Sequence, residues 1–252
     1  MKATERYASI EEIVNREGSI SVAALKRYFP HISDMTLRRD LDYLDKASRI
    51  IRVHGGVRSI QATIGTEASY LLRNTLHVEN KQEIARKAVE LLHPNTCIFV
   101  DSGSTTTALC KIIPQEHFLI YTSGLLCAQE LTRLQKSELY ILGGQLNCAS
   151  LSTNGLFALS SIENIHFDLA LIGSTGFTPE CGFTSGNFED ARLKSEVIKR
   201  ANKRVILMDS TKVGRVSTFT FAFPDVIDVV VTDGNLDAAT KEHFKKHNTE
   251  IL

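Results

Sequence analysis

The chain has 252 residues, enough for two ordinary domains or one large one, and its 43% hydrophobic and 23% charged residues are typical of a globular protein with a sizeable core. No apolar run approaches the roughly 20 residues that span a bilayer. The polar start MKATERYASIEE is unlike a secretory signal, so we expect a cytoplasmic protein. The five cysteines are odd in number and lack CxxC spacing, which argues against a disulfide framework or a zinc site; we expect no metal and no cofactor.

The formal net charge is zero, but the charge is unevenly distributed. The first 60 residues hold 11 Lys and Arg against 8 Asp and Glu, which leaves 18 against 21 for the rest. A head of net charge +3 therefore precedes a body of net charge −3. The positive sign of the head is the one that attraction to nucleic-acid phosphates requires.

Residues 1–60 are predicted to form a small domain of helices followed by a hairpin. The predicted elements are helices at 6–17, 22–29 and 33–44, with a short strand at 19–21. Gly18 is suited to end the first helix and Ser21 to cap the second, which Pro30 ends because proline lacks a backbone N–H. This is the order of a helix-turn-helix motif whose recognition helix comes second.

The third helix carries its chemistry at its N-terminal end. Its apolar side chains recur at helical spacing, at Leu37, Leu41 and Leu44. Ser33 or Asp34 can cap the first turn. Thr36, Arg38 and Arg39 follow at the end that a recognition helix presents to base edges. One guanidinium suits a guanine edge and the other a phosphate, in an order that the sequence leaves open. The alternative is that the Arg pair belongs to an ordinary solvated face.

Residues 49–59 contain two short β-type runs about a Gly-Gly turn, which predicts a small hairpin, or wing, after the helices. Its residues Arg52, His54 and Arg58 are expected near the DNA backbone or minor groove. For His54 an ordinary surface role remains the alternative.

The run T-L-R-R-D-L-x-x-L, followed by I-x-R-x-H-G-G-V, closely resembles the N-terminal winged helix-turn-helix domain of the DeoR family of bacterial transcription regulators. The resemblance implies operator DNA as a partner. The DNA contacts expected from the helix and the wing together are Ser33, Thr36, Arg38, Arg39, Arg52, His54 and Arg58.

The rest of the chain is predicted to be a linker, residues 61–77, and a larger domain, residues 78–252. Strands are predicted at 97–101, 118–122, 138–142, 167–173, 204–209 and 228–232, and helices at 81–92, 105–113, 125–135, 188–201 and 237–247. Apolar strands that alternate with amphipathic helices indicate an α/β fold with a mostly parallel sheet. Such sheets bind ligands beyond the carboxyl ends of their strands.

Small hydroxyl residues and glycines follow several of these strands. Backbone N–H groups, hydroxyls and a helix N-terminus together suit a phosphate group, and lysines add positive charge. The expected ligand-binding residues are Asp101, Ser102, Gly103, Ser104, Thr105, Thr106, Ser123, Gly124, Gly143, Gly144, Gly173, Ser174, Thr175, Glu189, Lys194 and Lys212. Each turn taken singly is as well explained by ordinary capping, and Lys194 by a solvated helix face.

The larger domain also resembles the C-terminal sensor domain of the DeoR family, which is similar to ribose-5-phosphate isomerase and the CoA-transferase group. The run DSGSTTTA resembles the isomerase phosphate loop. In the isomerase, acidic residues follow the strand that corresponds to residues 167–173, whereas residues 173–176 here contain no carboxylate. Without a general acid or base near the sugar carbons, we expect binding without turnover and no catalytic residues.

The sequence therefore predicts a repressor of a carbohydrate-utilisation operon, not an enzyme, whose DNA affinity is set by a phosphorylated sugar. Paired half-sites imply a homodimer or homotetramer. One alternative is a sugar-phosphate isomerase-like enzyme with a DNA-binding head, in which Asp101, Glu189 and Lys194 would carry the chemistry. Another is a constitutive DNA-binding protein whose pocket is vestigial.

Overall fold

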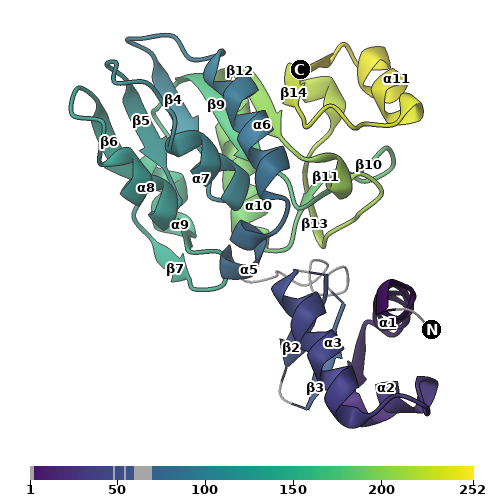
Figure 1. Cartoon of the computed structure of the whole chain (residues 1–252). Coiled ribbons are helices and arrows are strands. Elements are labelled where there is room, and N and C mark those ends of the chain that lie inside the picture. Colours follow the sequence, from purple (N-terminus) through teal and green to yellow (C-terminus); the bar gives the residue numbers. More distant parts are fainter. Residues whose placement is uncertain (1–2, 48, 54, 60–69) are drawn as a thin grey trace. The chain divides into compact units, whose positions relative to one another are not determined.

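The computed structural model describes residues 3–47, 49–53, 55–59 and 70–252, which form two compact units that divide between Ala68 and Ser69 (Figure 1). His54 and residues 61–69 of the predicted linker lie outside the described residues. The boundaries predicted at residues 60 and 78 stay predictions. Within the described ranges, no helix is both long and apolar enough to cross a membrane.

The first unit has the predicted order of helices and hairpin strands. Its elements are α1 (Ala3–Glu17), β1 (Ser19–Ser21), α2 (Val22–Tyr28), α3 (Asp34–Lys46), β2 (Ile51–Val53) and β3 (Gly56–Arg58). The strands form an antiparallel sheet in the order β1-β3-β2, so the wing hairpin is extended by the strand that precedes α2. One buried cluster joins these elements and includes Ile10, Val14, Leu25, Leu37, Leu41, Leu44, Ile50 and Val57.

The helix ends follow the local signals in the sequence. Ser21 Oγ accepts a hydrogen bond from Ala24 N at 3.1 Å, and Ser33 Oγ accepts one from Thr36 N at 3.1 Å. Of the two caps left open for α3, the structure uses Ser33. Gly18, which follows α1, has φ +68°, a conformation that favours glycine.

The second unit is built on a seven-stranded sheet in the order β15-β14-β12-β9-β4-β5-β6, in which every pairing is parallel. The strands are β4 (Cys97–Val100), β5 (Leu119–Thr122), β6 (Glu138–Ile141), β9 (Phe167–Gly173), β12 (Ala201–Leu207), β14 (Val229–Val231) and β15 (Glu250–Ile251). The prediction of an α/β domain with a mostly parallel sheet is confirmed, with β15 as an additional edge strand.

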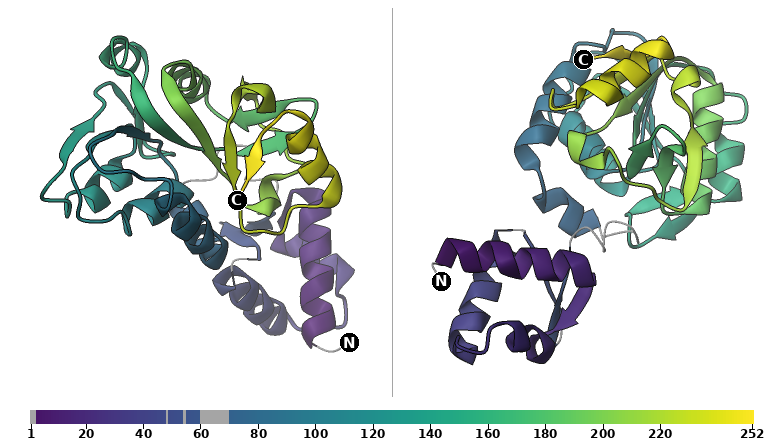
Figure 2. Two further views of the ribbon diagram at one scale, coloured as in Figure 1. Left: turned by 90° about the horizontal axis from the view of Figure 1, so that it is seen from above. Right: turned by 90° about the vertical axis from the view of Figure 1, so that its right-hand side faces the viewer.

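Helices cover both faces of this sheet (Figure 2). The apolar faces of α6 (Val78–Val89), α7 (Ser104–Cys110) and α8 (Leu125–Leu131) share one buried cluster with the sheet. A second cluster, on the other face, contains side chains of α9 (Leu156–Ser161), α10 (Phe188–Lys199) and α11 (Ala238–Lys246). All seven strands run parallel, so their carboxyl ends meet at one edge of the sheet.

Several short elements escaped the sequence analysis because they have too few residues to show a period. They are α5 (Tyr70–Thr75), the hairpin β7 (Gln145–Asn147) and β8 (Ser152–Asn154), helix α9, the antiparallel strands β10 (Gly176–Thr178), β11 (Gly182–Ser185) and β13 (Phe219–Ala222), and the short helices η1 (Ser210–Lys212) and η2 (Pro224–Val226). Helix α5 falls inside the stretch predicted to be a linker, and its Tyr70 is buried.

Candidate functional site

Helix α3 presents two arginines without protein partners. Arg38 and Arg39 are exposed, and neither side chain has an ion pair or hydrogen bond to another described residue. Leu37 and Leu41, on the opposite side of the helix, are buried in the core. The helix therefore holds two guanidinium groups in solvent on a rigid support, ready to bond to base edges or phosphates.

Asp40, which follows the two arginines, has a structural role. It is 3% exposed and accepts two hydrogen bonds from the guanidinium of Arg6 on α1, one of them at 2.9 Å from NH2. Beside this pair, the rings of Tyr7 and Tyr43 stack with their centroids 4.6 Å apart. These contacts fix α3 against α1, and hence the direction in which Arg38 and Arg39 point.

The other predicted DNA contacts are divided between local structure and open surface. The hydroxyls of Ser33 and Thr36 bond to each other at 2.8 Å at the start of α3. Arg52 forms an ion pair with Asp42 of α3, so that pair must open before its guanidinium can reach DNA. Arg58 on β3 is exposed and has no ion-pair or hydrogen-bond partner for its side chain in the described ranges.

Glycine is required at the two adjacent wing positions for different physical reasons. Gly55 has φ +74° with open space around it, so its backbone conformation calls for glycine. A Cβ on Gly56 would lie 2.8 Å from the carbonyl oxygen of Ile20 in β1, so its strand approaches β1 too closely for a side chain. The Gly-Gly pair of the sequence motif therefore builds the wing and seats it on β1.

In the second unit, buried charges from α10 and from the end of β4 meet at the carboxyl edge of the sheet. Lys194 Nζ on α10 lies 2.8 Å from Asp101 Oδ2, which follows β4, and 3.3 Å from Asp190 Oδ2, also on α10. It also donates a hydrogen bond to the carbonyl oxygen of Gly173 at 2.9 Å, and the Gly173 N–H donates to Asp101 Oδ2 at 2.9 Å. Three of the predicted ligand-binding residues, Asp101, Gly173 and Lys194, are thus in direct contact.

Lys194 is a buried ammonium shared by two carboxylates. Burial by itself would lower the pKa of Lys194, but the charges of Asp101 and Asp190 outweigh it and hold that pKa above its ordinary value. Burial raises the pKa of Asp101, an effect that Lys194 reduces and Asp190 adds to. Ser185 donates a hydrogen bond to Asp190 at 2.5 Å. The ammonium is fully occupied, whereas Asp101 Oδ1 is buried without a hydrogen-bond partner among the described residues.

A second group of charges surrounds Asp209, which follows β12. The carboxylate is 1% exposed, and its Oδ1 accepts a hydrogen bond from Thr211 N at 3.1 Å at the start of η1. Its negative charge acts on the cations Lys81, Lys212 and Arg215, and the positive charge of Arg73 acts on both lysines. Three cations therefore feel the charge of one carboxylate, and a fourth, Arg73, lies in range of the two lysines; we call these five residues the Asp209 cluster.

Burial lowers the pKa of each of three cations in the Asp209 cluster. The pKa of Lys81 falls to about 8, and those of Lys212 and Arg215 also lie below their ordinary values, because burial outweighs the attraction of Asp209. The positive charge is therefore only partly compensated within the protein. A bound anion would stabilise it.

Several buried polar atoms lack a hydrogen-bond partner, and three of them lie where strands of the parallel sheet end. Within the described part of the chain they include Asp101 Oδ1, Ser123 Oγ, Asn154 Nδ2, Asp209 Oδ2, Arg215 NH1 and Ser217 Oγ. Asp101, Ser123 and Asp209 each directly follow, or lie within two residues of, a strand of the parallel sheet. Buried polar groups are normally hydrogen-bonded, so this set offers donors and acceptors to a polar ligand.

Other predicted ligand residues are engaged in local structure. Thr106 Oγ1 donates to the carbonyl of Gly103 at 3.0 Å, and Ser174 Oγ donates to that of Gly176 at 2.8 Å. A Cβ on Gly144 would lie 2.4 Å from the carbonyl oxygen of Asn154, so close packing explains why this position is glycine.

The remaining predicted residues differ in what surrounds them. Ser104 lines a cavity of about 670 Å³ between α6 and α7, together with Lys81 and Lys111. Glu189 is half-buried, but Asp190, its neighbour on α10, is the acid that contacts Lys194. A Cβ on Gly124 would lie 3.0 Å from Ser102 Cα, so the loops after β4 and β5 touch. As ligand contacts, all of the predicted residues stay predictions.

Sequence reasoning missed Arg73, Lys81, Asp190, Asp209 and Arg215. Asp209 is the last residue of the strand predicted at 204–209, as Asp101 is of the strand predicted at 97–101, so the rule used for Asp101 could have found it. Arg73 and Lys81 lie before the first strand of the sheet, on α5 and α6, and no spacing in the sequence links them to Asp209.

Comparison with known proteins identifies both units. A model described as the DeoR-like helix-turn-helix domain matches residues 6–63, and one described as the DeoR C terminal sensor domain matches residues 76–234. The chain is 32% identical to the HTH-type transcriptional regulator GlpR of Haloferax volcanii, over 100% of this chain and 98% of that protein. It is 32% identical to the regulator GolR of Listeria innocua, over 96% and 94% of the two chains.

A more distant sequence relative is named as a repressor, and the similarity to solved structures is weaker. The chain is 25% identical to the glycerol-3-phosphate regulon repressor of Escherichia coli, over 100% of this chain and 99% of that protein. A solved ribose 5-phosphate isomerase from Methanocaldococcus jannaschii covers 53% of each chain with 16% identity and a TM-score of 0.39. That structural likeness is too low to carry an argument about function.

Proposed function

Because the chain belongs to the DeoR family of DNA-binding transcriptional regulators, we propose that it represses a carbohydrate-utilisation operon and that a phosphorylated sugar bound to its second unit alters its DNA affinity. The chain is a regulator and not an enzyme. The observation that carries the sugar phosphate proposal is the pairing of an excess of buried positive charge with an unpartnered carboxylate oxygen at one edge of the sheet.

The two groups of charges suit the two ends of a sugar phosphate. The Asp209 cluster has more cations than anions, so it would hold the phosphate through charge-assisted hydrogen bonds. Asp101 Oδ1 is a free acceptor held in place by Lys194, and it would accept a hydrogen bond from a sugar hydroxyl. The strands that lead to Asp101 and Asp209 are separated in the sheet by β9 alone.

One relative is named the glycerol-3-phosphate regulon repressor, and another the putative aga operon transcriptional repressor. These names favour a phosphorylated polyol or sugar as the class of ligand. The experiment is a thermal-shift screen of the full chain against phosphorylated sugars and polyols and their unphosphorylated partners. A ligand at about 100 times its Kd should stabilise the fold by about 2.7 kcal/mol.

Variants make the ligand screen specific to the site. Lys212→Ala should abolish the shift because it removes a phosphate contact. Asp101→Asn should abolish it because Lys194 and the Gly173 N–H retain the amide oxygen, which leaves an N–H donor where the free Oδ1 acceptor lies. The control is Lys199→Ala, since Lys199 is 69% exposed on α10. A shift caused equally by free sugars, or one that survives Lys212→Ala, contradicts the proposed site.

The DNA arm of the proposal rests on Arg38 and Arg39. Arg38→Ala and Arg39→Ala should each weaken binding to the operator by about 10- to 100-fold, in line with the ~1–3 kcal/mol that a bidentate base contact contributes. The matched control is Arg192→Ala, which removes an exposed arginine without an ion-pair or hydrogen-bond partner among the described residues. Fluorescence anisotropy with fragments from promoters near the gene measures the loss. Unchanged affinity in both α3 variants would refute this assignment.

A further inference from the structure

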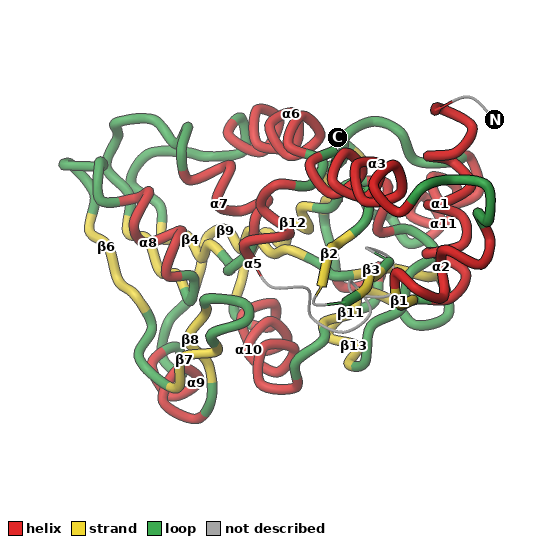
Figure 3. The backbone as a smooth tube through the Cα atoms, turned by 60° about the horizontal axis from the view of Figure 1, so that its bottom comes forward, coloured by secondary structure: helices red, strands yellow, loops and turns green. Residues whose placement is uncertain are grey.

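Strand β6 presents an unprotected edge of the seven-stranded sheet. Of the described strands, only β5 pairs with it, and no strand lies beyond it (Figure 3). Leu139, Tyr140 and Ile141 are 37%, 45% and 49% exposed. Edge strands are often protected from pairing by shortness, charged side chains, proline or a bulge; β6 is short, but its four residues, ELYI, contain neither lysine nor proline and carry a charge only at Glu138.

The hydrogen bonds to β5 fix which backbone groups face outward. The N–H of Glu138 donates to the carbonyl of Phe118 at 2.9 Å, and that of Leu142 to the carbonyl of Thr122 at 2.8 Å. Because backbone direction alternates along a strand, residues 138, 140 and 142 bond to β5. Leu139 and Ile141 therefore direct their N–H and C=O groups away from the sheet, where a further strand can pair with them.

We propose that a second copy of this chain occupies this edge, with the two β6 strands antiparallel about a two-fold axis at Tyr140. In this register Leu139 lies opposite the partner's Ile141, and Ile141 opposite the partner's Leu139. Each of these pairs exchanges two N–H···O bonds, and Tyr140 faces the partner's Tyr140 as a non-hydrogen-bonded pair. The alternation of outward groups makes the edge complementary to itself, as a two-fold interface requires.

The side chains fit the same register. Tyr140 stacks on Tyr121 with ring centroids 4.8 Å apart and an interplanar angle of 13°. This stacking holds the ring of Tyr140 in place next to the proposed two-fold axis. Aromatic pairs and aliphatic pairs that face each other across two strands are stabilising. The only charged residue of the strand, Glu138, lies opposite the partner's Leu142, so no like charges meet.

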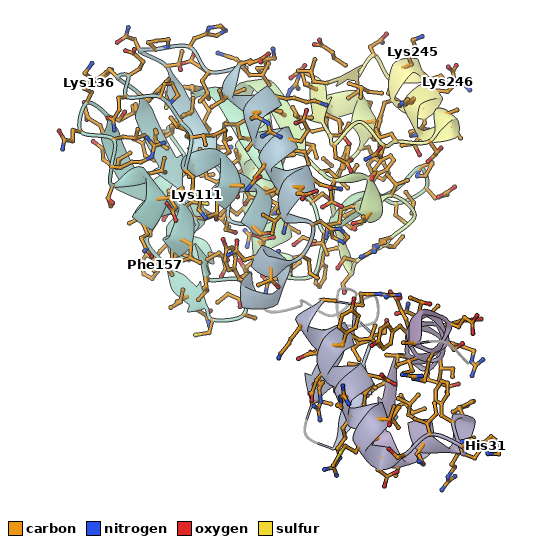
Figure 4. The ribbon with its side chains drawn as sticks, viewed as in Figure 1. His31, Lys111, Lys136, Phe157, Lys245 and Lys246 are labelled. Atoms are coloured by element: carbon orange, nitrogen blue, oxygen red, sulfur yellow. The ribbon has the colours of Figure 1, made fainter. Side chains whose placement is uncertain are left out.

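Helix α9 adds apolar surface on the Tyr140 face. Its Ala158 belongs to the buried cluster against which Tyr121 packs, so α9 and the tyrosine stack share one face of the sheet. Leu156 and Phe157 of α9 are 73% and 74% exposed, and Figure 4 shows Phe157 on the β6 side of the unit.

Sedimentation of the full chain tests the interface. We expect the double variant Leu139→Lys/Ile141→Lys to have half the native assembly mass. In the proposed register each introduced lysine faces a lysine of the second copy, and their repulsion blocks pairing. The control is Val226→Lys, since Val226 is as exposed as Leu139, at 37%, but lies on η2. An unchanged mass for the double variant, or a monomeric native chain, overturns the proposal. This result is independent of the sugar phosphate proposal, because no ligand is present.

Cysteine cross-linking tests the register. Facing Cα atoms in a non-hydrogen-bonded antiparallel pair are ~4.5 Å apart, within reach of a disulfide, whereas diagonal neighbours are ~7–8 Å apart. In a Cys148→Ser background, Tyr140→Cys should form a covalent dimer on oxidation and Leu139→Cys should not. Dimer from neither variant, or from Leu139→Cys alone, contradicts the pairing. If an unrelated extended peptide were the natural occupant, the native chain would sediment as a monomer.

Discussion

Buried charge determines what the second unit can bind at the scale of single residues. Lys81 is 6% exposed and donates hydrogen bonds to the carbonyls of Arg73 and Leu76. Its pKa falls to about 8, chiefly through burial and to a smaller extent through the charges of Lys212 and Arg73, against the attraction of Asp209. A bound phosphate would favour the charged form, so ligand binding and protonation of Lys81 are linked.

Ligand affinity should therefore depend on pH. Affinity for a sugar phosphate should fall as the pH rises above about 8, because the free protein loses the Lys81 proton that the complex retains. One linked proton gives a decrease of up to about tenfold per pH unit. Calorimetric titration from pH 7 to pH 9.5 measures it. Lys81→Gln should bind more weakly at pH 7 and show a shallower dependence; an equally steep one would mean that Lys81 is not the group responsible.

Asp40 links a single residue to the orientation of the recognition helix. Asp40→Ala leaves Arg6 without its partner, and we expect it to destabilise the first unit by about 2 kcal/mol. Urea denaturation followed by circular dichroism measures the shift of the first unit's transition. Asp45→Ala is the comparison, because Asp45 is exposed and accepts a bond from the wing backbone at Arg52. Equal destabilisation by the two variants would show that the buried Asp40–Arg6 pair stabilises the first unit no more than the exposed Asp45 does.

At the scale of elements, the wing depends on close packing of three short strands. β3 lies between β1 and β2, and the Gly56 backbone passes against Ile20 of β1. The three strands are short, so the sheet has little other support. The wing therefore tolerates little change at this crossing.

The two glycines of the wing should respond differently to alanine. Gly55→Ala should cost about 1 kcal/mol because it strains a positive φ in open space. Gly56→Ala should cost more, and should also weaken operator binding, because its Cβ would push β3 away from the carbonyl oxygen of Ile20. Thermal unfolding and anisotropy titrations of both variants measure this. A larger loss for Gly55→Ala would contradict the packing explanation.

At the scale of the whole molecule, regulation requires that ligand and DNA bias the same equilibrium. Arg73 and Lys81 of the Asp209 cluster lie on α5 and α6, the first two described helices after residues 60–69, which lead from the first unit. A ligand held by these cations would therefore contact the segment that continues into the DNA-binding unit. The polypeptide chain itself would then connect the ligand site to the DNA-binding unit.

The coupling between the two sites should be reciprocal. If a sugar phosphate changes the affinity for operator by a given factor, operator must change the affinity for the sugar phosphate by the same factor. A factor of ~5 to 150 is typical. Anisotropy and calorimetry measure the two factors. Arg73→Gln should reduce both together. If the ligand binds but operator affinity does not change, the chain is a constitutive DNA-binding protein.

Local patterns in the sequence determined the longer elements, their order in the winged helix-turn-helix domain and the parallel sheet. Caps such as Ser21 and Ser33 and apolar spacing such as Leu37 to Leu44 act between neighbours in the chain, so they can be recognised without coordinates. The contact of Asp101 with Lys194 was within reach of the same reasoning, because parallel strands all end at one edge.

Only the tertiary structure decided which charges share a site. Arg73 acts on the charge of Lys212 across more than a hundred residues, and the acid of α10 that contacts Lys194 is Asp190, whereas the sequence analysis had singled out Glu189 as a ligand-binding residue. The outward-facing edge of β6 likewise follows from its place at the end of the sheet. Long-range electrostatics and strand order depend on how the chain closes on itself, and no spacing along the chain encodes them.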